Sequence, residues 1–355
     1  MTHPSDSGSA VVCEAPMRLT VAGGGTDLPE VYGFGPTWVL GVTVDLAVRV
    51  AVADSPRFAT AGAGLSTRDA AFALDMDSDD PHPYLRAAIA LLQIRKPRFH
   101  VSVRSHVLPG SGLGGSGAFC AALLGALARF QCQAVTVADI AEAAFRLERE
   151  LLGRPVGKQD AWISAVGGAV RLSLSSRGHV RTRAHPALLT AMERLLDRDL
   201  LVFALPDQRD AARVLSAAAP GTEQARAAAL RAAEMTEQAF LSCDTAVIGD
   251  VLRRHWAEKV RRNPAADHEL CRRVAATAGR TGIHGFKLLG AGGGGHMLVA
   301  LDSSRRAEVM ACLSGLGLAH VPVKVTRRGL TAAPVRPATS GASQAFPGGW
   351  RGSCA

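Results

Sequence analysis

A glycine-rich segment at residues 108–118, LPGSGLGGSGA, has the composition of a phosphate-binding turn. It contains five glycines and two serines, and it lies between an alternating run at 99–107 and an Ala- and Leu-rich run at 118–130. The first run predicts a strand and the second a helix, so the glycines fall on a strand-to-helix turn. Glycine allows positive φ and close approach of a ligand, and the amides at a helix start attract anions. This turn therefore predicts a polyphosphate site.

Two other interpretations of the same turn remain open. The first is a turn that only connects a strand to a helix. The second is a dinucleotide site of a nicotinamide-dependent oxidoreductase, because Gly110, Gly112 and Gly115 have the G-x-G-x-x-G spacing. The acidic residue that such a site needs about 20 residues further on is missing, since that distance falls near Gln131. No G-x-x-x-x-G-K-[ST] string occurs, so a Walker-type ATP site is not predicted.

Two more glycine-rich segments accompany this turn, RLTVAGGGTDLP at 18–29 and KLLGAGGGGHMLVAL at 287–301. The order and the sequences of the three segments resemble the motifs of the GHMP kinases, the superfamily of galactokinase, homoserine kinase and mevalonate kinase. Within it, the chain is most similar to D-glycero-D-manno-heptose 7-phosphate kinases, whose first motif has the form R-[IL]-x-x-A-G-G-G-T-D. The resemblance covers about residues 16–301, and the segment 148–168 (ERELLGRPVGKQDAWISAVGG) carries part of the subfamily signal.

The resemblance implies an α+β, two-domain GHMP kinase fold. Residues 11–178 would form an N-terminal domain like the second domain of ribosomal protein S5, and residues 179–330 a ferredoxin-like C-terminal domain. ATP and the acceptor would meet in the cleft between them. Residues 331–355 mix Pro, Gly, Ser and Ala without periodicity, which predicts a flexible tail.

The resemblance also implies catalytic residues. Asp160, in GKQDAW, matches the aspartate that acts as a catalytic base in many relatives, where it accepts the proton of the attacking hydroxyl. Arg18 and Lys158 would offset the charge that develops on the phosphoryl oxygens. Some relatives instead use a lysine or an arginine to polarise the hydroxyl, so both schemes remain open.

The nucleotide and its metal would be held by the glycine turn. Ser116 matches the serine that binds the Mg²⁺ of Mg-ATP in these kinases, and Glu148 matches the glutamate that completes the metal site. Hard oxygen ligands of this kind suit Mg²⁺. The residues expected to wrap ATP are Pro109, Gly110, Ser111, Gly112, Leu113, Gly114, Gly115, Ser116 and Gly117.

The acceptor is expected to lie against the other two glycine-rich segments. The residues expected to bind it are Gly24, Gly25, Thr26, Asp27, Gln159, Gly292 and Gly293. A carboxylate such as that of Asp27 accepts hydrogen bonds from two neighbouring hydroxyls, which favours a polyol. A phosphate at the far end of the substrate would need a cation, and the candidates, unranked, are Lys158, Arg18, Arg154 and Lys287.

This chain departs from the family at two places. Gly115 and Gly117 replace residues that carry hydroxyls in the usual GLGSSS wording, which puts nucleotide affinity or choice in doubt. His296 stands where Phe or Met is common in the family, and a packing or capping role is expected for it.

The predicted function is ATP-dependent phosphorylation of the anomeric hydroxyl of a heptose 7-phosphate, which gives the 1,7-bisphosphate. The alternatives are an octose 8-phosphate kinase of lincosamide-type antibiotic biosynthesis, giving the 1,8-bisphosphate, and a non-catalytic nucleotide-binding homologue. The oxidoreductase is a third alternative, and it would bind NAD without responding to Mg²⁺.

Composition fits a globular enzyme. The chain has 355 residues, 48% of them hydrophobic, and a formal charge of +9. Its Lys and Arg are scattered and few aromatics lie among them, so anionic small molecules are expected as partners and nucleic acid is not. Seven cysteines form no C-x-x-C pair, and no signal peptide or membrane-length apolar run is recognised. We expect a cytoplasmic protein, without a membrane partner, that is a monomer or a homodimer.

Periodicity predicts the elements that position these residues. Strands are expected at 11–22, 37–53, 169–174, 200–204, 286–289, 296–301 and 321–325, in addition to the strand before the glycine turn. Helices are expected at 84–93, in the region 137–152, from residue 160, across 208–278 and at 305–313. This mixture is an α+β layout.

Overall fold

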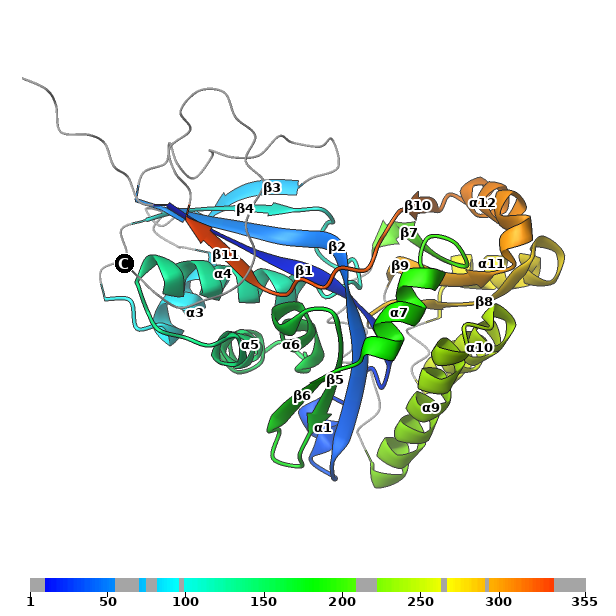
Figure 1. Ribbon diagram of the computed structural model, residues 1–355, viewed down its shortest axis with the longest axis horizontal. Helices are drawn as coiled ribbons and strands as arrows, with labels where there is room; N and C mark the ends of the chain where they lie inside the picture. The colour runs from blue at the N-terminus through cyan, green and yellow to red at the C-terminus, as the bar shows by residue number, and fades with distance from the viewer. Residues whose placement is uncertain are drawn as a thin grey trace, which may run out of the picture.

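The computed structural model describes residues 10–54, 70–74, 82–95, 99–208, 222–262, 267–290 and 294–334. They form two sheets with helices packed on them (Figure 1). The strands are β1 (Ala10–Ala22), β2 (Thr37–Ala53), β3 (Ala70–Leu74), β4 (His100–Ser105), β5 (Ala169–Leu174), β6 (Val180–Ala184), β7 (Leu200–Gln208), β8 (Ile283–Leu288), β9 (Gly294–Leu301), β10 (Ala319–Val321) and β11 (Thr331–Pro334).

The helices alternate with these strands. They are α1 (Pro29–Tyr32), α3 (Pro83–Leu91), α4 (Gly115–Phe130), α5 (Val137–Arg146), the π-helical turn η1 (Leu147–Leu151), α6 (Gln159–Val166), α7 (Pro186–Leu195), α9 (Glu223–Ser242), α10 (Thr245–Arg262), α11 (Glu269–Thr281), the 3₁₀ turn η3 (Ser303–Arg305) and α12 (Arg306–Gly315). The α+β prediction is confirmed.

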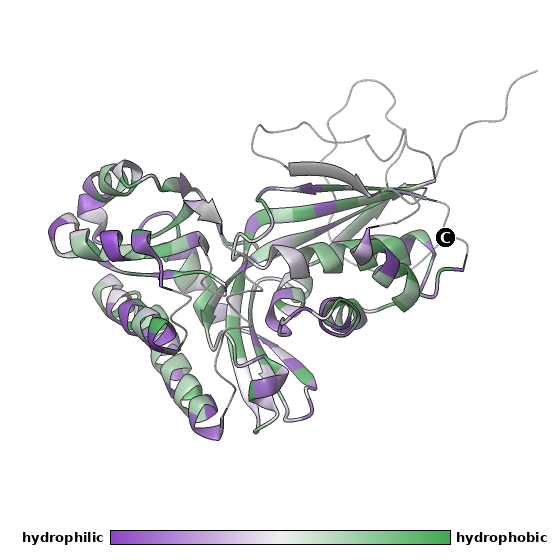
Figure 2. Cartoon of the chain, turned by 180° about the vertical axis from the view of Figure 1, so that it is seen from behind, coloured by the Kyte–Doolittle hydropathy of each residue, from purple (hydrophilic) through white to green (hydrophobic). Residues whose placement is uncertain are grey.

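The N-terminal sheet is antiparallel and is built around the long strand β2. The order is β11-β1-β2-β4-β3, and β5 pairs with the first half of β2 and with β6. Helices α4, α5 and α6 lie on one face, where α4 packs on β1 and β2 (Figure 1). Apolar residues concentrate along α4 and the strands it covers (Figure 2), because its Ala and Leu side chains are buried.

The C-terminal sheet has the order β10-β7-β9-β8. Helices α9 to α11 separate β7 from β8, and α12 separates β9 from β10, so the chain order is β-α-β-β-α-β. This order is the ferredoxin-like arrangement, as predicted. Helix α10 packs on β8 and β9, which brings it to the edge of the N-terminal sheet where α9 contacts β1 and β2.

Several elements differ from the sequence-based expectation. Residues 331–334, expected to begin a flexible tail, form β11 and pair with β1, because an edge strand satisfies its backbone through the ladder whatever its side chains. Residues 335–355 lie outside the described part. Strand β6 carries the N-terminal sheet beyond residue 178, and β10 ends at Val321, where the predicted strand was to begin. Helix α7 was not predicted.

No helix in the part of the chain that the structure describes is long and apolar enough to cross a membrane.

Candidate active site

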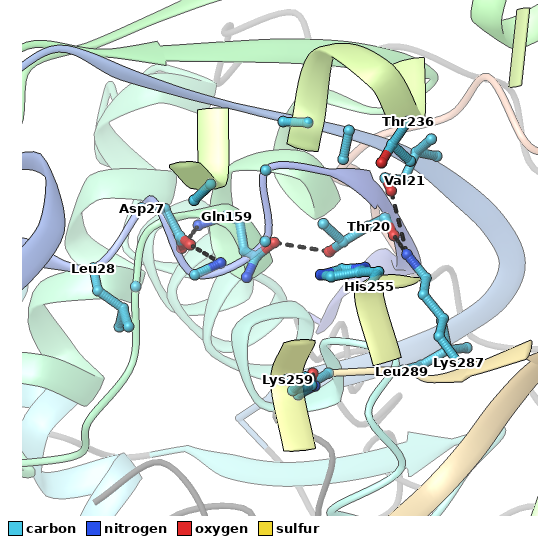
Figure 3. A pocket seen from close by; sticks show the side chains of 18 of the residues that line it. Thr20, Val21, Asp27, Leu28, Gln159, Thr236, His255, Lys259, Lys287 and Leu289 are labelled. Atoms are coloured by element: carbon cyan, nitrogen blue, oxygen red, sulfur yellow. Dashed lines mark hydrogen bonds between the residues drawn. The ribbon is translucent and has the colours of Figure 1, made fainter. Parts of the chain in front are cut away.

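A cavity of about 340 Å³ lies where elements of the two sheets meet, as Figure 3 shows. This volume falls in the range of sites for small ligands. Its wall is formed by β1 and the turn after it, the start of α6, one face of α9 and α10, and the end of β8. The polar lining residues are Arg18, Thr20, Asp27, Gln159, Asp160, Thr236, His255, Glu258, Lys259 and Lys287.

The glycine turn between β4 and α4 passes close to this cavity. It is the predicted strand-to-helix turn, with Gly110, Gly112 and Gly114 at φ of 81°, 77° and 75°. These values favour glycine, because other residues rarely adopt left-handed φ. The first amides of α4 have no intrahelical acceptors, and they therefore offer donors and the positive end of the helix dipole to an anion.

The third glycine-rich segment holds the glycine turn in place. A Cβ on Gly112 would lie 2.6 Å from the carbonyl oxygen of Leu289, so the two segments touch through their backbones. His296 is 5% exposed, and its Nδ1 lies 2.7 Å from the carbonyl oxygen of Ser111. Burial lowers the pKa of His296, so the neutral ring is the donor to this carbonyl. His296 therefore has the packing role that the sequence suggested.

Arg18 connects the glycine turn to Asp160. Its Nε and Nη2 donate to Oδ1 of Asp160 at 2.9 and 2.5 Å, and its Nη1 donates to the carbonyl oxygen of Gly112 at 2.8 Å. The arginine side chain is 3% exposed and that of Asp160 is 24% exposed, so the carboxylate still reaches the cavity. Register shifts in β1 on both sides of Arg18 turn this part of the strand toward the site.

Glu148 and Ser116 meet at the start of α4. Ser116 is exposed on the first turn of the helix, and its side chain hydrogen-bonds the carboxylate of Glu148. Glu148 is 2% exposed on η1, and π-helical turns of this kind are frequent at functional sites. Burial raises the pKa of Glu148 to about 7, with a further contribution from the negative charge of Asp160. A buried carboxylate beside a second negative charge forms a site where a cation is favourable.

Asp27 lines another side of the cavity. It is 1% exposed and accepts hydrogen bonds from the amides of Gly25 and Gln159, at 3.2 and 2.8 Å. Burial raises the pKa of Asp27 to about 6. Gly157 is required beside it, because a Cβ there would lie 2.0 Å from Oδ2 of Asp27. The side chain of Gln159 accepts a hydrogen bond from Thr20 at 2.8 Å.

Comparison with known proteins agrees with this geometry. Residues 83–168, which include the glycine turn, Glu148 and Asp160, match the GHMP kinases N terminal domain. A D-glycero-alpha-D-manno-heptose 7-phosphate kinase of Campylobacter jejuni is 24% identical over 315 residues, 84% of this chain and 92% of that protein. Residues 83–168 are therefore a GHMP kinases N terminal domain, and the heptose 7-phosphate kinase is a distant relative of most of the chain.

Solved structures confirm the α+β GHMP kinase fold. The structure of a D-glycero-D-manno-heptose 1-phosphate kinase from Bacteroides thetaiotaomicron is similar with a TM-score of 0.68 and 17% identity, over 92% of this chain and all of that one. Lactococcus lactis galactokinase, complexed with galactose, is similar with a TM-score of 0.61 and 15% identity, over 90% of this chain and 95% of that one. The protein is therefore an ATP-dependent phosphotransferase that acts on an alcohol group.

Two residues expected at the kinase site are directed elsewhere. Lys158 is buried and donates to Glu142 on α5 at 2.5 Å, away from the cavity, because a buried ammonium needs a counter-ion. The hydroxyl of Thr26 donates to the carbonyl oxygens of Gly23 and Trp38, at 2.8 and 2.9 Å, and so stabilises the turn. Neither side chain lines the cavity.

The remaining predicted residues divide between the cavity and its surroundings. Gly24 and Gly25 line it. Arg154 lies 5.5 Å from the ring of Tyr84 and does not line it. Gly292 and Gly293 lie outside the described residues.

Sequence reasoning missed several residues of the cavity wall, among them His255 and Lys259. These two are separated by one turn of α10, and both line the cavity (Figure 3). Their i, i+4 spacing was visible in the sequence, but this helix carries many charged residues and nothing distinguished this pair.

Proposed function

We propose that this kinase transfers the γ-phosphoryl group of ATP to the anomeric hydroxyl of a heptose 7-phosphate, giving the 1,7-bisphosphate. The observation that carries the proposal is the position of Asp160. Its carboxylate faces a cavity that also holds Asp27 and Gln159, while Arg18 connects it to the glycine turn. An acceptor hydroxyl and a nucleotide phosphate would therefore meet at this carboxylate. The similarity to a heptose 7-phosphate kinase supports the choice of sugar.

Asp160 acts as the general base in this proposal. Its carboxylate accepts the proton of the anomeric hydroxyl as the oxygen attacks the γ-phosphorus, and ADP leaves. Arg18 orients Asp160 through two hydrogen bonds to one oxygen, Oδ1, which leaves Oδ2 for the substrate. Arg18 also donates to the carbonyl oxygen of Gly112, so it fixes the position of the base relative to the glycine turn.

Mg²⁺ fits the oxygen ligands at the start of α4. The hydroxyl of Ser116 and the buried carboxylate of Glu148 are hard donors that already contact each other. When bound, Mg²⁺ neutralises charge on the nucleotide phosphates. The protein's own contribution is to hold this pair beside the first amides of α4, where the triphosphate is expected.

We expect Glu148→Gln and Ser116→Ala to raise the Mg²⁺ concentration for half-maximal rate by about tenfold or more, as typical of lost metal-site groups. A Mg²⁺ titration at saturating ATP and acceptor measures this. Glu150→Gln is the matched control, since Glu150 is on the same π-helical turn but pairs with Arg146 at 2.9 Å on the surface. An unchanged Mg²⁺ requirement in both variants would remove these residues from the metal site.

Acceptor binding is expected to weaken as the pH falls through about 6. The pKa of Asp27 is raised to about 6, so this group loses its charge and part of its accepting capacity below that pH. Between pH 8 and pH 5 the KM for the sugar should rise by about tenfold, the change in the ionised fraction across one pH unit below the pKa. The phosphate of the substrate titrates in the same range, with a pKa near 6.

The variant Asp27→Asn separates the two titrations. It retains the titration of the substrate's phosphate and removes that of residue 27, so its KM should depend less steeply on pH than that of the native kinase. Identical pH profiles for the KM in the two proteins would contradict a role of Asp27 in binding hydroxyls. Its KM for ATP serves as the internal control and should stay unchanged.

The direct test of the proposed function is ADP release with Mg-ATP on a panel of acceptors. The panel contains heptose 7-phosphate, heptose 1-phosphate, octose 8-phosphate, galactose and unphosphorylated heptose, and phosphorus NMR locates the new phosphate. A 1,7-bisphosphate formed at the highest kcat/KM supports the proposal. Preference for another acceptor, or a phosphate at another position, rejects it.

A further inference from the structure

Two lysines on the cavity wall, Lys259 and Lys287, donate hydrogen bonds to backbone carbonyl oxygens. Lys287 on β8 is 5% exposed, and its Nζ donates to the carbonyl oxygens of Thr20 and Val21 at 3.0 and 3.2 Å. Lys259 on α10 donates to the carbonyl oxygen of Gly290 at 2.7 Å. Within the ranges that the structure describes, neither ammonium group pairs with a carboxylate. Each ammonium has three donors, so both retain donors for a ligand.

The positive charges at this wall are unfavourable without an anion. Burial lowers the pKa of Lys259 to about 7 and that of Lys287 to about 8. The charges of Lys287 and Arg18 lower the pKa of Lys259 further, and Arg18 also lowers that of Lys287. Like charges in a partly desolvated wall destabilise one another, and a bound anion would reverse this effect.

The carboxylates that also line the cavity do not supply this anion. Asp160 pairs with Arg18 at 2.5 Å, and Glu258 pairs with Arg261 at 2.7 Å on α10. Asp27 accepts backbone amides on another side of the cavity, and in Figure 3 it and Lys287 are on opposite sides of the view. The anion that suits this wall is therefore expected to come with a ligand.

We propose that Lys259 and Lys287 bind the phosphate monoester that the acceptor sugar already carries. This inference rests on the proposed function, because it assigns one end of the substrate to the cavity. The sugar hydroxyls would contact Asp27 and Gln159, the reacting hydroxyl would face Asp160, and the far phosphate would lie between the two ammonium groups. Of the four cations that the sequence suggested for binding the far phosphate, this arrangement selects Lys287. It also assigns Lys259, which the sequence analysis did not suggest, to the same phosphate.

The test compares the variants Lys259→Met and Lys287→Met with the native kinase on two acceptors, heptose 7-phosphate and unphosphorylated heptose. Methionine keeps an unbranched apolar side chain and removes the charge. We expect kcat/KM for the sugar phosphate to fall about 10- to 100-fold in each variant, the usual effect of removing a hydrogen bond to a charged group. The kcat/KM for the unphosphorylated sugar and the KM for ATP should stay within about twofold. Lys324→Met, at an exposed lysine outside the cavity, is the matched control.

A second measurement does not depend on turnover. Binding of inorganic phosphate is measured by calorimetry in the presence of Mg²⁺ and a saturating non-hydrolysable ATP analogue, which blocks the nucleotide site. The native kinase and Lys324→Met should bind phosphate, and both cavity variants should bind it at least about tenfold more weakly. If Lys287→Met does not fold, Lys287→Arg should retain phosphate binding while Lys259→Met loses it.

The possible outcomes separate this inference from the proposed function. If phosphate binding depends on both lysines but heptose 7-phosphate is not turned over, the phosphate subsite is supported and heptose 7-phosphate is rejected as the substrate. Turnover of heptose 7-phosphate with equal losses on both sugars rejects the subsite and keeps the function. A raised KM for ATP in the variants assigns the lysines to the nucleotide and also rejects the subsite.

Discussion

The variant Asp160→Asn is expected to lower kcat by about 10²-fold or more, with little change in the binding of ATP. Asparagine keeps the size of the side chain and one oxygen for Arg18, but it cannot accept the proton of the acceptor hydroxyl. Steady-state kinetics measure kcat, and calorimetric titration with an ATP analogue measures binding.

The matched control for Asp160→Asn is Asp45→Asn. Asp45 is an exposed aspartate on β2 that accepts a hydrogen bond from the backbone amide of Lys324 at 2.8 Å and does not line the cavity. It should leave kcat unchanged. Thermal unfolding of each variant shows whether the ion pair with Arg18 also matters for stability. Near-native turnover by a folded Asp160→Asn protein would exclude this carboxylate as the base.

The second large effect is expected at Gly117, which allows the helices α4 and α6 to touch. A Cβ at this position would lie 2.6 Å from the backbone nitrogen of Ala161 and 2.7 Å from Cβ of Asp160. Because one of these atoms belongs to the backbone, α6 must move to accommodate it. We expect Gly117→Ala to lower the free energy of unfolding by about 3 kcal/mol, at the upper end for overpacking. A shift of Asp160 should also lower kcat by about 10²-fold.

Gly115→Ala is the matched control for stability, in the same turn of α4. Its Cβ would meet nothing closer than 3.8 Å, so the variant should be as stable as the native kinase or slightly more stable. Chemical denaturation measures both variants. Equal losses of stability at the two positions would show that the contact between α4 and α6 does not explain Gly117.

The surroundings of Gly115 and Gly117 bear on their departure from the usual family motif. The sequence shows only that Gly115 and Gly117 replace residues with hydroxyls, and it suggests a weakened nucleotide site. In the structure, Gly117 is in contact with the residue proposed as the base, whereas Gly115 has room for a side chain. Packing therefore explains the glycine at position 117 and does not explain the glycine at position 115.

Much of the fold could be predicted where periodicity was strong. Strands β1 and β2 match the predicted 11–22 and 37–53 to within one residue, since their alternation matches a sheet with one face under α4. Strand β6 was missed because its residues, VRTRA, are largely exposed and have no apolar pattern. Strand β11 was missed because it forms by backbone pairing with β1, and the composition of residues 331–334 does not indicate which strand they pair with.

The candidate site divides in the same way. Gly110 could be named from the glycine turn itself, and Ser116, Glu148 and Asp160 from the resemblance to the GHMP kinases, because each lies in a short local motif. Lys158 stands two residues before Asp160, yet it points to Glu142, and the orientation of adjacent side chains on a helix depends on what packs around them.

The sequence alone determined the family, the glycine turn and the residues at helix starts, since these depend on a few neighbours along the chain. Only the tertiary structure decided that Thr26 stabilises a turn, that Arg18 connects the turn to Asp160, and that Lys259 and Lys287 share a wall. The contacts of Arg18 join residues 94 and 142 positions apart, and the other two relations depend on which side chains pack together. In each case burial and charge depend on the assembled fold and not on spacing in the chain.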